Sequence, residues 1–540
     1  MSVDALQFSL PPIVADTPVR PDETAAWLVR LPLLNAPQAS REILNQLTTL
    51  NQRMLDDNWR LKLLELFRPP ISSVCTALEK SYESMPLPLA EHHQHAAERI
   101  RSLYAGMATG YKRLVLASSR RANTSARERD HAALVTQRAI RYLGHVIASS
   151  FSLYGAPPSG IWREMHDLYR YAESEGFTDT PVSDALNFCV SASSVSHVYK
   201  QALLLDFADP YHLPPRMLGR VHTWLDAYAP LAHLSQALEA LRPNCQFLLN
   251  LATDRAGISN VGDPAVTTEV RYRLLTTVEL ARHAHIQLKH LERDDAVETP
   301  GLCNDFYAAQ GVEMLTRLVT AWGVQPKRHF TRTPRHRVPI EVVSGLSMIN
   351  QIANGSVPFT RSTGTVGPMP QRNWLGKGTP MNARRAREVL VGAAAKLIEE
   401  SAGGFSFERA GSRDSPVRVG DLIATRAPGD GGPRNIAMVR WVMAPTPDAV
   451  RVGAKRIAPI ASPVGLVPAD LPDTDLQLSL RLAAIPALKQ LETLIAPRGM
   501  YRPERLLVLD DGYRTVRVLA TRLIHSTGSF EHFEFRVIEQ

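Results

Sequence analysis

Residues 327–337 read KRHFTRTPRHR, and residues 338–343 continue without a break as VPIEVV. The alternation in the second stretch predicts the start of a β-strand. Further on, residues 397–407 (LIEESAGGFSF) read as a strand, a turn of small residues and another strand. Residues 417–424 (VRVGDLIA) and 438–443 (MVRWVM) repeat the strand pattern. Short strands separated by turn signals indicate a small barrel or sandwich, so we expect a β-barrel that a basic segment precedes.

The chain ahead of this region has a helical pattern. Apolar residues such as Ile43 and Leu47 recur at three- and four-residue spacing, which is typical of amphipathic helices. We therefore expect an all-α domain, a bundle or an irregular solenoid, over residues 39–325. One of its helices should end or kink before Pro69. Residues 1–38 are dotted with prolines, which predicts an extended N-terminal arm.

The chain beyond the barrel is again rich in β-patterns. Residues 506–519 (LLVLDDGYRTVRVL) form a strand, an Asp-Gly turn and a strand, which is a hairpin signal. We place the barrel at residues 326–465 and a C-terminal β-rich module at 466–540, and the pattern leaves open whether this module completes the same barrel or forms a second one. Within the barrel region, residues 382–397 favour a helix, with a partial strand as the alternative. The predicted fold class is α+β multidomain, with the all-α domain first.

Composition limits the class of protein and its compartment. The chain has 540 residues and a formal net charge of +8, which favours binding of anions. Residues 326–388 alone hold eleven Lys or Arg against two acids. The four cysteines lie far apart, which argues against a disulfide framework or a zinc site. The start of the chain does not read as a signal peptide, and no apolar run is long enough to span a membrane. We expect a cytoplasmic protein with no metal site and no cofactor.

Two groups of residues in the barrel region match a known pattern. The basic segment holds four arginines, of which the first two have the spacing Arg-x-x-x-Arg: Arg328, Arg332, Arg335 and Arg337. The turn between the strands has the form Glu-x-Ser-x-x-Gly: Glu399, Ser401 and Gly404. This order resembles PilZ domains, whose arm carries Arg-x-x-x-Arg and whose barrel carries Asp/Asn-x-Ser-x-x-Gly. With the helical half ahead of it, the whole chain resembles large proteobacterial proteins with divergent PilZ domains.

The resemblance implies binding of cyclic di-GMP. Guanidinium groups make fork-shaped bonds to phosphate and to guanine, and they also stack on bases. By the resemblance, the arginines hold phosphate and guanine, Ser401 bonds the ligand, and Gly404 lets the backbone turn. Five residues separate Arg332 from Val338, so Arg335 or Arg337 is an alternative member of the arginine pair. Glu399 is one methylene longer than the Asp of PilZ domains.

The same residues allow other interpretations. An arginine cluster at a domain junction is also typical of a solvated linker, and a Ser-Ala-Gly-Gly stretch is also typical of a tight turn. We find no catalytic motif, so the predicted function is a non-enzymatic second-messenger receptor that relays its signal through the helical domain to a protein partner. The alternative is a degenerate PilZ-like scaffold for protein partners that binds no nucleotide. Nucleic-acid binding is less favoured because aromatic residues are sparse in the basic window.

Overall fold

We analysed a computed structural model of the chain. It describes residues 6, 8–14, 20–83, 85, 87–121, 125–187, 189–236, 244–259, 271–293, 295–300, 302, 306–323, 330–362, 393–410, 417–429, 435–446, 449–471, 474–484 and 491–538. The chain divides into two compact units, which are described separately. Unit 1 comprises Met1–Met85 and Leu89–Lys327, and unit 2 comprises Pro86–Pro88 and Arg328–Gln540.

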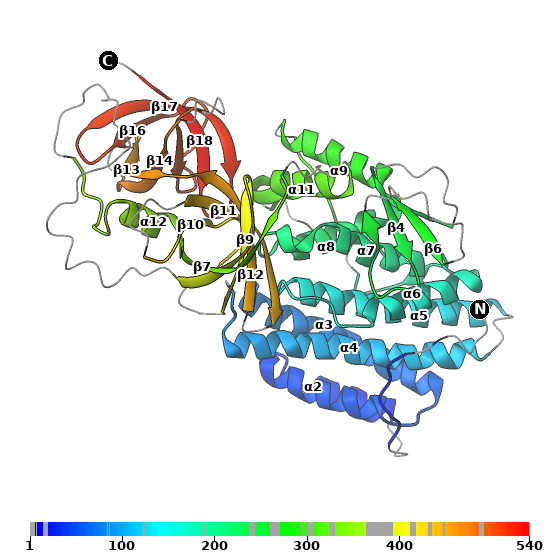
Figure 1. The fold of residues 1–540 in the computed structure, drawn as a ribbon. Coiled ribbons are helices and arrows are strands. Elements are labelled where there is room, and N and C mark those ends of the chain that lie inside the picture. The colour runs from blue at the N-terminus through cyan, green and yellow to red at the C-terminus, as the bar shows by residue number, and fades with distance from the viewer. Residues whose placement is uncertain are drawn as a thin grey trace. The chain divides into compact units, whose positions relative to one another are not determined.

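Unit 1 is a helical domain (Figure 1), as the sequence predicted. Its helices are α1 Pro21–Val29, α2 Ala36–Asn51, α3 Asp57–Tyr82, α4 Glu91–Ser119, α5 Ala126–Phe151, α6 Ile161–Ser174, α7 Val195–Phe207, α8 Met217–Tyr228, α9 Val278–Leu291 and α11 Val312–Trp322, with short turns η2 Pro210–His212, η3 Ala229–Leu231 and η4 Tyr307–Gly311. Helix α4 contacts α2, α3 and α5, and α7 contacts α5 and α8. The stacked, fully buried rings of Trp224 and Trp322 join α8 to α11.

The helical domain also contains strands that the sequence did not reveal. A four-stranded antiparallel sheet has the order β3-β6-β4-β5. Its strands are β3 His233–Ser235, β4 Gln246–Asn250, β5 Ile258–Ser259 and β6 Tyr272–Thr276, and a separate pair consists of β1 Val182–Ser183 and β2 Ala192–Ser193. Strands of two to five residues carry too few alternating positions for a reliable period.

The structure corrects two expectations for unit 1. The arm predicted to be extended contains the helix α1, which begins at Pro21. Proline is tolerated there because the first N–H groups of a helix have no acceptor. Helix α3 does not end before Pro69, one of the two expected outcomes, but continues through Pro69 and Pro70 to Tyr82. Interior proline costs about 3 kcal/mol, and the buried Phe67 and Ile71 on either side offset that cost by keeping the apolar face in the core.

Unit 2 begins with a closed six-stranded barrel of order β10-β11-β12-β9-β8-β7, in which the paired neighbours are antiparallel. Its strands are β7 Thr333–Ser344, β8 Ala393–Ser401, β9 Gly404–Ala410, β10 Leu422–Arg426, β11 Asn435–Thr446 and β12 Ala449–Ala458. Residues 382–397 were expected to favour a helix, with a partial strand as the alternative. Residues 393–397 belong to the strand β8, because they fill the barrel position between β7 and β9. Residues 382–392 lie outside the described residues.

A second closed barrel follows, with the order β13-β14-β15-β18-β17-β16. Its strands are β13 Ala461–Pro468, β14 Gln477–Leu482, β15 Thr493–Ala496, β16 Leu506–Asp510, β17 Thr515–Ser526 and β18 Glu531–Val537. The C-terminal β-rich module is therefore a barrel of its own. The boundary expected between residues 465 and 466 was wrong, because it falls inside β13, and we propose residues 459–460 as the link between the barrels. The boundary expected at residues 325–326 falls outside the described residues.

The helix α12, Leu346–Ala353, joins the two barrels (Figure 1). Ile349 lies in a buried cluster with Val343 and Leu422 of the first barrel and Leu480 of the second. The fully buried Asn350 donates hydrogen bonds to carbonyl oxygens of β13 and β14, at 3.1 and 2.7 Å. A shared apolar core, together with the two hydrogen bonds from the Asn350 amide nitrogen, makes the two barrels one packed unit.

Candidate functional site

The arginine segment lies on the first strand of the first barrel. Arg335 and Arg337 belong to β7, and Arg332 immediately precedes it. Pro334 pairs with Glu399 and Val338 with Leu397, so three β7 residues stand opposite the single residue Ile398. Arg337 has a φ of 52°, in the left-handed region, which costs a non-glycine residue about 1–2 kcal/mol. Such a bulge redirects the side chains of a strand. Arg328 lies outside the described residues.

Two glutamates of β8 hold two of these arginines. The Nη1 of Arg332 donates to Oε2 of Glu399 at 2.8 Å, and the Nε of Arg335 donates to Oε2 of Glu400 at 3.0 Å. Both arginine side chains are 46% exposed, so each pair contributes only about 0–1 kcal/mol to stability. The arginines are held where solvent and solutes reach them.

Arg456 of β12 completes this group, and the sequence analysis missed it. Its Nη2 donates to Oε1 of Glu400, so Glu400 bridges Arg335 and Arg456. The Arg456 guanidinium lies over the ring of Phe405 at 5.2 Å, and its backbone N–H donates to the Gly403 carbonyl at 3.1 Å. The Lys-Arg pair in the last strand of the barrel was the available signal, but only barrel closure brings β12 beside β9.

Arg337 lies apart from the other arginines. Its Nη2 is 3.9 Å from Oε1 of Glu408, and Arg451 of β12 approaches the other oxygen of Glu408 at 3.7 Å. The structure thus brings Arg332, Arg335 and Arg456 around neighbouring glutamates of β8 and places Arg337 on a different carboxylate.

The Ser401–Gly404 turn links β8 to β9. Ser401 Oγ donates to the Gly404 carbonyl at 3.1 Å, and the two residues pair across the hairpin. A Cβ on Gly404 would lie 2.3 Å from the Ala454 carbonyl oxygen, so glycine is required for the close approach of β12. Gly404 was expected to let the backbone turn, and its φ lies outside the left-handed region that favours glycine. A Cβ on Gly403 would meet the ring of Phe330 at 2.8 Å, which places this 55%-exposed aromatic beside the turn.

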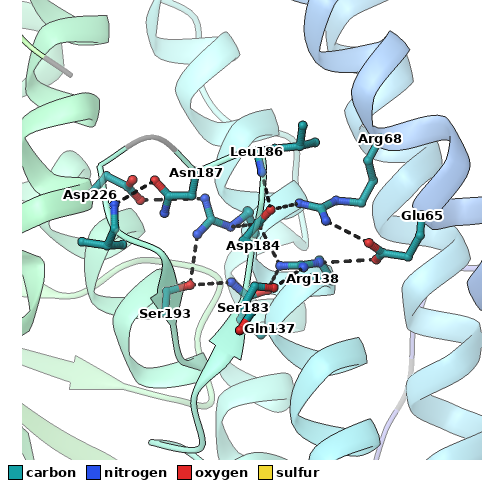
Figure 2. Close-up of polar contacts among 12 residues, drawn as sticks. Glu65, Arg68, Gln137, Arg138, Ser183, Asp184, Leu186, Asn187, Ser193 and Asp226 are labelled. Carbon is teal, nitrogen blue, oxygen red and sulfur yellow. Dashed lines mark hydrogen bonds and ion pairs between the residues drawn. The ribbon is translucent and has the colours of Figure 1, made fainter. Parts of the chain in front are cut away.

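The helical domain contains a second charged group, and it is buried (Figure 2). Asp184, whose side chain is 1% exposed, accepts from Arg68 at 2.6 Å and from Arg138 at 2.8 Å. Burial by itself raises the pKa of Asp184, but the hydrogen bond from Arg68 and the charge of Arg138 outweigh burial and lower it. Arg141 lies 3.6 Å from Asp184 and 3.8 Å from Asp226.

This buried network has a structural role. Its three arginines face three carboxylates, because Glu65 adds contacts to Arg68 and Arg138 at 2.9 and 3.4 Å. Gln137 donates to Ser193 Oγ at 2.8 Å, so the network also fixes the β1–β2 segment against α3 and α5 (Figure 2). With its charges paired inside the domain, the network offers no cation to a solute. Charged residues on the apolar side of predicted helices were the sequence signal for it.

In the part of the chain that the structure describes, no three His, Cys, Asp or Glu side chains are grouped closely enough to hold a metal ion. Among the described helices, none has the length and apolar composition needed to cross a membrane.

These features define a class of protein: a helical domain followed by two joined β-barrels, the first of which presents a group of arginines. Residues 22–240 match the family model "Cyclic-di-GMP receptor FimW, N-terminal domain", and residues 464–538 match "FimW C-terminal beta-barrel domain". Together the two matches cover more than half of the chain, which belongs to the FimW family of cyclic-di-GMP receptors. The arginine group lies between the two matched segments.

The "Cyclic-di-GMP receptor FimW" of Pseudomonas aeruginosa is 26% identical over 575 aligned residues, which cover 96% of this chain and 91% of the relative. The alignment therefore extends over the first barrel as well. No solved structure matches the chain.

Proposed function

We propose that this chain is a non-enzymatic receptor that binds cyclic di-GMP at the arginine group of the first barrel. The observation that carries the proposal is the convergence of Arg335 and Arg456 on Glu400, with Arg332 on the neighbouring Glu399. A dinucleotide with two phosphates needs several guanidinium groups in reach of one another. Arg335 and Arg456 already meet at one carboxylate, and both side chains are partly exposed to solvent.

The surroundings of the arginines suit the bases of the ligand. Phe330 presents an exposed ring beside the Ser401–Gly404 turn, and a guanine can stack on such a ring or on a guanidinium plane. Ser401 has a hydroxyl that can exchange its contact with the Gly404 carbonyl for a ligand atom. Arg328 and Arg337 remain proposed contributors, because both belong to the basic segment at residues 327–337.

Signal output is proposed to use the helical domain. A ligand shifts a conformational equilibrium only by its difference in affinity for the two states. Binding would take the arginines from Glu399 and Glu400. In sequence, these arginines follow the segment that connects the barrel to the helical domain. We propose that a protein partner of the helical domain reads this change.

A scaffold without nucleotide binding is the second candidate, and one observation favours it. Arg332, Arg335 and Arg456 already have carboxylate partners, and Glu399 stands where PilZ domains have Asp or Asn. Because these arginines are already paired with glutamates of the same barrel, they need no nucleotide to balance their charge.

Calorimetric titration of the full chain with cyclic di-GMP, with cyclic di-AMP and GTP as controls, separates the two candidates. The test variant is Arg332→Ala/Arg335→Ala. Its matched control is Arg282→Ala on α9, since Arg282 is also an exposed, ion-paired arginine, 60% exposed against Glu279. Selective binding in the wild type and in Arg282→Ala, with a loss of at least about tenfold in the double variant, is expected for two charge-assisted contacts. Absence of heat and of thermal stabilisation at a large ligand excess would refute the receptor and leave the scaffold.

A further inference from the structure

The two barrels also meet at a group of basic side chains that the proposed cyclic di-GMP site does not use. The β17–β18 hairpin contacts the first barrel, where Ser529 Oγ donates to Oδ1 of Asp421 at 2.7 Å. Next to this contact, the Nζ of Lys455 on β12 lies 3.4 Å from Nε2 of His525 on β17. An ammonium group can only donate, so the His525 ring is neutral and accepts at Nε2, with its Nδ1 toward the Ile524 carbonyl.

Lys455 differs from the arginines of the same barrel. Each of Arg332, Arg335 and Arg456 contacts a carboxylate, whereas Lys455 contacts none among the described residues. Its side chain is exposed, so a solute anion can reach it. Because the Lys455 ammonium lies next to a neutral imidazole and not next to a carboxylate, a bound anion would supply the opposite charge that it lacks.

A second, independent feature is the adjacent histidine of β18. His532 is 3% exposed, and its Nε2 lies 2.9 Å from Thr493 Oγ1, while its buried Nδ1 has no hydrogen-bond partner. Its ring stands edge-on to His525, with the ring centroids 5.8 Å apart. A buried ring nitrogen without a partner is costly and needs an explanation such as a bound solute.

The charged groups that act on Lys455 and His525 are positive. Burial lowers the pKa of Lys455, and the nearby Arg440 lowers it further. Burial also lowers the pKa of His525, and among the charges around it Lys455 and Arg440 act in the same direction. Glu534 is the acidic group that faces His532, and Arg522 already engages it. The ammonium therefore lacks a counter-charge of its own.

We propose that Lys455, His525 and His532, with Arg440 beside them, form a binding site for a phosphate group between the two barrels. The Lys455 ammonium would turn from His525 to a phosphate oxygen, and the freed Nε2 would take a proton from solvent and become a second donor. Because Lys455 belongs to the first barrel and both histidines to the second, a bound phosphate stabilises the junction between them.

Thermal unfolding of the full chain in sodium phosphate, against sodium chloride of equal ionic strength at the same pH, tests the site. For a dissociation constant of about 1 mM, 20 mM phosphate should raise the midpoint by roughly 2–4 °C. Lys455→Met and His525→Gln should each lose most of this rise. Lys396→Met, which removes an exposed lysine of β8 in the same barrel, should keep it. The readout is the phosphate-dependent increment, so a lower baseline midpoint does not obscure it.

No rise in the wild type, or an equal rise in Lys455→Met, would overturn the proposal. GMP in place of phosphate tests whether a phosphate ester is accepted as well as the free ion. Cyclic di-GMP titration of Lys455→Met keeps this inference apart from the proposed function. Retained cyclic di-GMP binding supports a separate site, and its loss would overturn the separation. If the wild-type protein is stabilised by phosphate but does not bind cyclic di-GMP, the proposed receptor function is refuted and the phosphate site is not.

Discussion

Replacing Glu400 by glutamine should tighten the binding of cyclic di-GMP. Glu400 occupies two of the proposed ligand arginines, with Oε2 on Arg335 at 3.0 Å and Oε1 on Arg456. A phosphate that takes these arginines has to displace the carboxylate and also lies near its negative charge. Glu400→Gln removes that charge and keeps the size of the side chain, so both costs fall.

The size of the effect follows from the exposure of the pairs. The Glu400 side chain is 28% exposed, Arg335 46% and Arg456 29%, so both pairs are screened by solvent. Each is worth roughly 0.5–1 kcal/mol at such exposure. Removing both should improve the affinity by about 1–2 kcal/mol, which corresponds to about 5- to 30-fold in the dissociation constant.

The assay is calorimetry of the wild type, Glu400→Gln and the matched control Glu408→Gln in one buffer. Glu408 contacts Arg337 and Arg451 at 3.9 and 3.7 Å, longer than the contacts of Glu400, so its substitution should change affinity by less than about threefold. The gain at Glu400 should shrink as salt is raised, because these charges are exposed. Unchanged or weaker binding in Glu400→Gln, with a retained fold, would refute displacement of the carboxylate by the ligand.

Three other expectations concern stability. Gly404→Ala should destabilise the barrel by about 1–3 kcal/mol in urea titrations, because its Cβ would meet the Ala454 backbone oxygen at 2.3 Å. Gly403→Ala should cost less, since the Phe330 ring that its Cβ meets can move, and equal costs for the two variants would contradict this reasoning. Asp184→Asn should lower the free energy of unfolding by about 3–5 kcal/mol, because it leaves buried arginines without their carboxylate. The control is Glu279→Gln at an exposed ion pair, and a loss of stability as small as in this control would show that the network is dispensable. Burial lowers the pKa of His166 to about 4, so the unfolded chain binds a proton there first and the free energy of unfolding falls as pH falls from about 6.5 to 4. In urea titrations at pH 7 and 4.5, His166→Gln should therefore lose less stability than the wild type between the two pH values, and an equal loss would refute the assignment.

The sequence by itself determined the order of the parts and the kind of chemistry. The three- and four-residue apolar period over residues 39–325 is set by the helix itself, so the helical character of that half was predictable. The strand after the arginine segment and the hairpin around the Asp-Gly turn near residue 511 were predictable for the same reason, since alternation and turn residues act locally. The basic segment by itself indicated an anionic ligand, and the resemblance of its arginine spacing to PilZ domains implied that this ligand is cyclic di-GMP.

Only the tertiary structure decided which distant residues meet. Arg456 reaches Glu400 because barrel closure places β12 beside β9, and no local period carries that information. The same holds for Asp184, whose three arginine neighbours come from α3 and α5, and for Asn350, which serves strands more than a hundred residues away. Residues 393–397 look helical in isolation and become a strand because β7 and β9 provide hydrogen-bonding edges on both sides. Local patterns therefore specify elements, whereas pairing and burial across the chain specify the site.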